Sequence, residues 1–112
     1  MTVLSDTDII SLVAKIDAEV QSLADNAKTI PEQFRYSNAS IYTARAATIH
    51  QEERRWSDLS DSYRYHYNLT QAADHVRPVN RSLAIRLVRL ANQINPPSTD
   101  DAERPDFYPG VG

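Results

Sequence analysis

The chain has 112 residues, a formal net charge of −3, 41% hydrophobic residues and no cysteine. This length suits one domain with a single core, and the lack of cysteine excludes disulfides and thiolate metal sites. The two glycines, Gly110 and Gly112, stand at the very end of the sequence, so the glycine-rich loops of Walker-type and Rossmann-type nucleotide sites are excluded.

The first predicted helix covers residues 5–27. Ser5 and Asp8 have the spacing of a capping box, and an apolar series with alternating steps of four and three residues follows. Its members are Ile9, Val13, Ile16, Val20 and Leu23, with Leu12 and Ala24 beside them. On a helix these side chains fill one arc, and the opposite side is polar. We expect this seam to pack inside the domain; the alternative is packing against a second copy.

Two further helices are predicted at residues 38–57 and 58–76. Ser37 and Ser40 can cap the first of them, and Pro31 suits a preceding turn or a first helical position. A narrow apolar stripe is formed by side chains that recur every seven residues, namely Tyr42, Ile49, Trp56 and Tyr63. Ser57 and Ser60 favour a restart, but the sequence leaves open whether residues 38–76 form one helix or two.

Residues 63–67 alternate between tyrosine and polar side chains, as a strand does, but no second strand is predicted for pairing. We therefore predict helix here. On a helix Tyr63 and Tyr67 share one side and Tyr65 faces nearly the opposite side, so at least one tyrosine is exposed. Tyrosine suits protein interfaces because it combines apolar area with a polar tip. Tyr65 is accordingly a candidate partner-binding residue.

The last predicted helix covers residues 79–95, with Asn80 as its cap. Its core face consists of Leu83, Leu87, Leu90, Ala91 and Ile94. The sequence thus predicts an all-α bundle of three or four helices at residues 1–95 and an extended, proline-rich, acidic arm at 96–112. In the arm Phe107 and Tyr108 are adjacent and stand between prolines, which is typical of a docking segment.

Basic residues are concentrated in the last helix. Residues 77–95 carry four arginines and no acid, namely Arg77, Arg81, Arg86 and Arg89, whereas the rest of the chain has an excess of acids. Arg81, Ile85 and Arg89 are spaced to share the side that faces away from the leucines. An isoleucine between two arginines is typical of an interface anchor with a charged rim. Alternatively, these arginines pair with acids of the arm or the first helix, or bind nucleic acid phosphates.

Catalytic and metal-binding patterns are weak. The three histidines have no spacing typical of a metal site, and Glu52 and Glu53 diverge by about 100° on a helix. No apolar run approaches the roughly 20 residues that span a bilayer, and the first residues are acidic rather than those of a basic leader. We therefore expect no cofactor, no metal, no membrane association, no enzymatic activity and a cytoplasmic location.

The function expected from the sequence is that of a small interaction or assembly protein, such as an accessory subunit, an inhibitor or immunity-type protein, or a viral structural component. It would bind a protein partner or its own copy. The partner-binding candidates are Arg77, Arg81, Ile85, Arg86, Arg89, Tyr65, Phe107 and Tyr108. The alternatives are a helical nucleic-acid-binding protein that uses the arginine-rich helix, and a small helical enzyme that uses Glu53 or a histidine.

Overall fold

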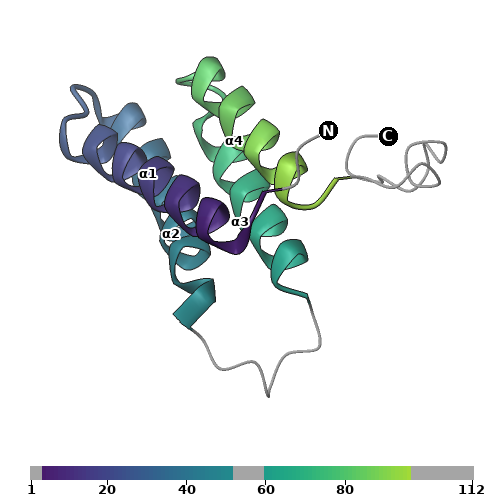
Figure 1. Cartoon of the computed structure of the whole chain (residues 1–112). Coiled ribbons are helices and arrows are strands. Elements are labelled where there is room, and N and C mark those ends of the chain that lie inside the picture. Colours follow the sequence, from purple (N-terminus) through teal and green to yellow (C-terminus); the bar gives the residue numbers. More distant parts are fainter. Residues whose placement is uncertain (1–3, 52–59, 97–112) are drawn as a thin grey trace, which may run out of the picture.

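The computed structural model describes residues 4–51 and 60–96 of the chain. Their regular structure is helical: α1 (Asp6–Asp25), α2 (Ile30–Thr48), the short 3-10 helix η1 (Ile49–Gln51), α3 (Asp61–Val76) and α4 (Arg81–Ile94). Helix α2 packs against both α1 and α3, and α4 packs against α3 (Figure 1). The predicted small all-α bundle is confirmed. The predicted arm, with Phe107 and Tyr108, lies outside the described residues, as do Glu52, Glu53 and Trp56.

Local capping explains where α1 begins. The Ser5 hydroxyl accepts a hydrogen bond from the Asp8 amide at 3.1 Å, and the Asp8 carboxylate accepts one from the Ser5 amide at 3.3 Å. This reciprocal pair satisfies amides that have no partner inside the helix. The apolar seam faces the core as predicted: Val13 and Val20 are fully buried, whereas Leu12, at the edge of the arc, is 36% exposed.

The predicted start of the second helix at residue 38 is wrong, because α2 begins at Ile30. The Thr29 hydroxyl accepts a hydrogen bond from the Glu32 amide at 3.3 Å and donates one to the Glu32 carboxylate at 2.8 Å. Pro31 is tolerated beside this cap because amides of the first turn have no helical acceptor. Ser40, expected near a cap, lies inside the helix and donates to the Ser37 carbonyl at 2.7 Å.

Within the described part of residues 38–76, α2 and α3 are separate helices rather than one continuous helix. Helix α2 ends at Thr48, and α3 begins after Ser60, whose hydroxyl accepts a hydrogen bond from the Tyr63 amide at 3.2 Å. The predicted seven-residue stripe is therefore wrong at Tyr63, which is 46% exposed although Ile49 is buried. A seven-residue spacing keeps side chains on one face only where the helix is continuous.

The core lies where the four helices meet, and α3 and α4 supply most of its aliphatic side chains. Leu69, Val76, Leu83 and Leu87 are almost completely buried. One polar side chain, Thr43, is also fully buried and donates a hydrogen bond to the Asp17 carboxylate at 2.8 Å, which joins α2 to α1. Such a bond offsets the cost of burying a hydroxyl.

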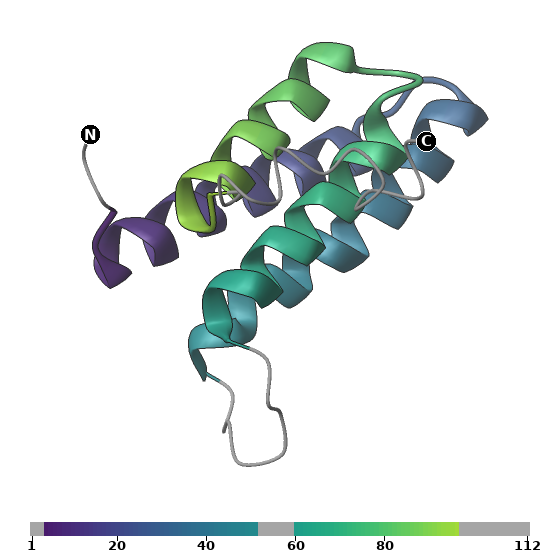
Figure 2. The same ribbon diagram turned by 90° about the vertical axis from the view of Figure 1, so that its right-hand side faces the viewer.

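Helix α4 starts at a cap that also reaches α2. The side-chain oxygen of Asn80 accepts a hydrogen bond from the Leu83 backbone amide at 3.0 Å, and the side-chain nitrogen of Asn80 donates one to the Tyr36 hydroxyl at 3.2 Å. In Figure 2, α4 lies over the upper part of the bundle and ends near the first turns of α1. Over the described ranges, none of the helices is long and apolar enough to cross a membrane.

Candidate functional site

The predicted arginine stripe lies on the outer side of α4. We call Arg81, Ile85 and Arg89 the cationic face. Both arginines are exposed, and Ile85 between them is 44% exposed. The opposite side of α4 carries its buried leucines. The sequence-based orientation of this face is therefore confirmed.

A shallow hollow of about 430 Å³ follows the cationic face. Arg77, Arg81, Ala84, Ile85, Val88 and Arg89 line it. Basic side chains thus surround an apolar floor, the arrangement of an interface core with a charged rim.

Two of the four arginines have acidic partners within the chain. Arg86 binds the Glu19 carboxylate through both terminal nitrogens, at 2.7 and 2.6 Å, and so connects α4 to α1. Arg77 binds Asp74 on the preceding turn of α3 at 2.7 Å. These contacts are of the kind expected for arginines that pair within the fold. Arg77 and Arg86 are consequently less suited to hold a partner than the sequence indicated.

Arg81 and Arg89 differ from these two arginines. Across residues 4–51 and 60–96, no carboxylate lies within 4.0 Å of either guanidinium. Within the described ranges both side chains are exposed to solvent. A guanidinium presents five donors in a planar fork that fits a carboxylate or a phosphate.

The Glu19–Arg86 pair has a definite electrostatic effect. The hydrogen bonds from Arg86 hold the pKa of Glu19 below its usual range, although burial acts in the opposite direction. The same bonds raise the pKa of Arg86. Both groups therefore stay charged near neutral pH. The pair joins α4 to α1 next to Arg89, which lines the same hollow.

A second hollow, of about 360 Å³, lies between α1 and α4. It is lined by Leu12, Lys15, Ile16, Glu19, Arg86, Arg89, Leu90 and Gln93. Arg89 lines this hollow and the hollow along the cationic face. The two hollows therefore adjoin at Arg89, and Leu12 adds an exposed apolar side chain beyond it.

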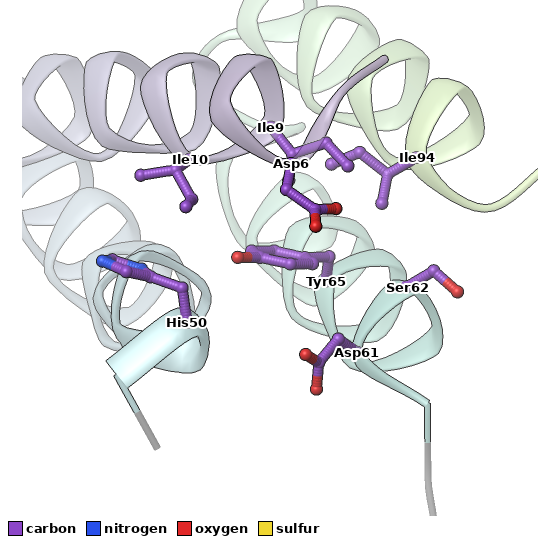
Figure 3. Close-up of a pocket in the computed structure, with 8 residues that line it drawn as sticks. All are labelled: Asp6, Ile9, Ile10, His50, Asp61, Ser62, Tyr65 and Ile94. Carbon is purple, nitrogen blue, oxygen red and sulfur yellow. The ribbon is translucent and has the colours of Figure 1, made fainter. Parts of the chain in front are cut away.

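Tyr65 lies away from the cationic face and is only 6% exposed. It belongs to a hollow of about 360 Å³ at the junction of α1, η1, α3 and α4, together with Asp6, His50 and Asp61 (Figure 3). Burial, and then the charges of Asp61 and Asp6, raise the pKa of the Tyr65 hydroxyl. Among the tyrosines that the structure describes, Tyr63 and Tyr67 are the exposed ones. We therefore leave Tyr65 out of the candidate interaction surface.

Metal binding has no support in the described part of the chain, where no group of three or more histidine, aspartate or glutamate side chains could hold an ion. Of the three histidines, His66 contacts the Ala91 carbonyl through Nδ1 at 3.2 Å, and His75 stacks on Tyr42 with ring centres 5.5 Å apart. His50 lines the Tyr65 hollow. These contacts tie helices together.

A second exposed surface, which the sequence did not indicate, lies on α2. Ile30 is 80% exposed, Phe34 is 61% exposed and Ile41 is 50% exposed. Their spacing places them on one side of the helix. The pattern could have been found from sequence only with the helix start at Ile30, because a start at residue 38 leaves Ile41 without its apolar neighbours.

Comparison of the chain with protein-family models, with curated proteins and with solved structures gives no match. The function is therefore inferred from the surfaces of the protein alone.

Proposed function

We propose that the protein is a small, non-enzymatic interaction protein that binds an acidic segment of a protein through the cationic face of α4. This acidic segment belongs either to another protein or to a second copy of this chain. Binding would combine hydrogen bonds from Arg81 and Arg89 to carboxylates with burial of Ile85 against an apolar side chain.

The difference between the four arginines of this region supports the proposal most strongly. Arg77 and Arg86 have carboxylate partners, whereas no carboxylate of the described residues contacts Arg81 or Arg89. The isoleucine between the latter two is 44% exposed. Chance placement of surface arginines does not predict an exposed apolar residue between two of them. Interface hot spots, in contrast, commonly combine arginine with an apolar residue that becomes buried on binding.

The chemistry of the partner follows from these side chains. The fork of each arginine favours a bidentate carboxylate, and the apolar floor at Ala84, Ile85 and Val88 favours an aliphatic or aromatic side chain. Residues 97–112 of this chain have such a composition, with four acids close to Phe107 and Tyr108. A peptide of this sequence is therefore a suitable probe.

Nucleic acid is the alternative ligand for Arg81 and Arg89. The overall charge of −3 opposes it, because a nucleic-acid-binding domain normally concentrates excess positive charge. A protein that neutralises several phosphates also loses affinity steeply as salt increases. The same titration with duplex DNA therefore separates the two possibilities.

The test measures binding of a labelled synthetic peptide of residues 97–112 by fluorescence anisotropy. The receptor is the full-length protein with the acids of its own segment replaced by amides (Asp100→Asn, Asp101→Asn, Glu103→Gln and Asp106→Asn), so that this segment competes less. We expect saturable binding that falls about tenfold or more when Arg81→Ser and Arg89→Ser are combined, as for loss of interface hot spots.

The matched control combines Lys28→Ser with Arg45→Ser, which removes the same charge from other exposed positions. This control should bind the peptide almost as the parent does. Equal loss in both double variants would indicate nonspecific charge attraction and contradict the proposal. Binding of duplex DNA without binding of the peptide would favour the nucleic-acid alternative.

A further inference from the structure

The outer side of α2 has the side-chain period of a helix–helix seam. Positions 30, 34, 37, 41, 44 and 48 follow one another in alternating steps of four and three residues, as the a and d positions of a heptad do. We call these residues the α2 seam: Ile30, Phe34, Ser37, Ile41, Ala44 and Thr48. The seam is separate from the cationic face, which lies on α4.

The α2 seam points away from the core of its own chain. The inward side of α2 carries Tyr36, Ala39, Thr43 and Ala46, which are all buried. In contrast, the three large apolar residues of the seam are 50% to 80% exposed. The buried side of α2 already packs against α1 and α3. A heptad pattern on the exposed side of an otherwise packed helix therefore points to an additional helix.

We propose that two copies of the chain pair through the α2 seam, with their α2 helices antiparallel. The observation that selects a second copy is the order of large and small side chains along the seam. In an antiparallel pair each a position lies opposite a d position. The layers then pair Ile30 with Thr48, Phe34 with Ala44, and Ile41 with Ser37 of the second copy.

Every layer of this pairing combines one large with one small side chain. Such alternation lets facing helices interdigitate without voids or clashes. A parallel pair would instead place Phe34 against Phe34 of the second copy and Ser37 against Ser37, so large and small layers would alternate along the interface. The antiparallel pair is also isologous, because the same patch is used twice around a twofold axis.

The flanking residues agree with this arrangement. Beside the seam lie Pro31, Gln33, Asn38, Ser40, Arg45 and Ala47. Pro31, Asn38 and Arg45 are the e positions, which line one side of the seam. In the antiparallel pair Arg45 lies nearest to Pro31 of the second copy, and the two copies of Asn38 lie nearest to each other. No two like charges face each other across the seam, and such repulsion is the usual device against pairing.

The first test is the mass of the full-length protein by sedimentation equilibrium from about 10 μM to about 1 mM, a range that covers weak association. We expect a concentration-dependent dimer that Ile41→Glu shifts to monomer, because the introduced carboxylates would lie in an apolar layer. The helical circular dichroism signal should not change, since Ile41 is half exposed.

The matched control is Ile85→Glu, at a similarly exposed isoleucine on α4. It should leave the dimer intact while it weakens peptide binding at the cationic face. A wild-type protein that stays monomeric over the whole range would overturn the α2 pairing. A dimer lost in Ile85→Glu but kept in Ile41→Glu would also overturn it and would assign self-association to the cationic face.

The second test uses the absence of cysteine from the chain, which lets one introduced thiol report on one position. Asn38 lies next to the proposed twofold axis, so Asn38→Cys should form a disulfide-linked dimer under mild oxidation. Two copies of residue 48 would be about 27 Å apart at the helical rise per residue, far beyond disulfide reach. Thr48→Cys should therefore stay unlinked. Equal cross-linking of the two variants would contradict the antiparallel register.

Discussion

Glu19 and Arg86 are 67 residues apart in sequence and form a bidentate ion pair that joins α1 to α4. The pair is a direct polar connection between the first and the last helix. Its side chains are still 37% and 52% exposed, so solvent weakens the attraction. The pair lies in the hollow between α1 and α4, and we expect it to add little to the stability of the fold.

A double-mutant cycle with Glu19→Gln and Arg86→Gln should give a coupling free energy of about 0.5–1 kcal/mol, the range for partly exposed pairs. Urea unfolding of the four proteins measures it. The coupling should decrease in high salt, because screening affects exposed pairs most. A coupling of several kcal/mol would show that the pair is better shielded from solvent than its exposure indicates.

The same pair predicts a dependence of stability on pH. Because the pKa of Glu19 is lowered in the folded protein, its contribution is present above the unfolded pKa of about 4.3. The contribution is lost as the pH falls through the folded-state value. The stability difference between wild type and Glu19→Gln should therefore shrink in acid. Asp25→Asn, at an exposed carboxylate, serves as the control and should show a smaller change.

Truncation should destabilise the protein much more on the core side of α4 than on its outer side. Leu87 is fully buried, so Leu87→Ala should lower the free energy of unfolding by about 2–5 kcal/mol. Ile85→Ala, two residues earlier but 44% exposed, should change it by less than about 1 kcal/mol. Urea unfolding measures both. Similar losses would place Ile85 in the core and remove the anchor of the cationic face.

The Asn80 cap should be worth more than an ordinary surface hydrogen bond. Asn80→Ala removes the acceptor of the Leu83 amide and the donor to the Tyr36 hydroxyl, and should cost about 1–2 kcal/mol of stability. Tyr36→Phe removes the second bond alone and should cost about 0.5–1.5 kcal/mol. The two losses should not add fully, because they share one bond. Full additivity in thermal or urea unfolding would exclude that shared contact.

Tyr65 predicts a loss of stability in alkali. Because burial and nearby carboxylates raise the pKa of its hydroxyl, the folded protein keeps this proton more tightly than the unfolded chain. The contribution is fully present below the unfolded pKa of about 10 and is lost as the pH rises toward the folded-state value. Tyr65→Phe should therefore blunt alkaline destabilisation, whereas Tyr63→Phe, at an exposed tyrosine, should not.

The parts of the fold that local sequence determines were predicted. The Ser5 capping box, the Asn80 cap and the leucine face of α4 each depend on residues within one or two helical turns. The helical spacing of the leucines in α4 also predicted which side of this helix carries Arg81 and Arg89. Such features need no knowledge of the remaining chain.

The parts that depend on tertiary structure were not predicted. Pro31 suited either a preceding turn or a first helical position, and it lies in the first turn of α2. The helix start expected at residue 38 hid the α2 seam. Whether Tyr65 or Tyr63 is buried depends on how α3 is rotated about its own axis. Because α3 is a separate helix from α2, the side-chain spacing in α2 does not determine this rotation. The pairing of Arg86 with Glu19 needs the packing of α4 beside α1, which no local pattern specifies.

Binding of an acidic protein segment to the cationic face should be visible residue by residue. The most direct measurement is an NMR titration of ¹⁵N-labelled full-length protein, with the acids of residues 97–112 replaced by amides, against the unlabelled peptide of residues 97–112. We predict that the amide shifts concentrate at Arg81, Ile85 and Arg89 and disappear when Arg81→Ser and Arg89→Ser are combined. Shifts that concentrate on α2, or that are absent at saturating peptide, would contradict the claim.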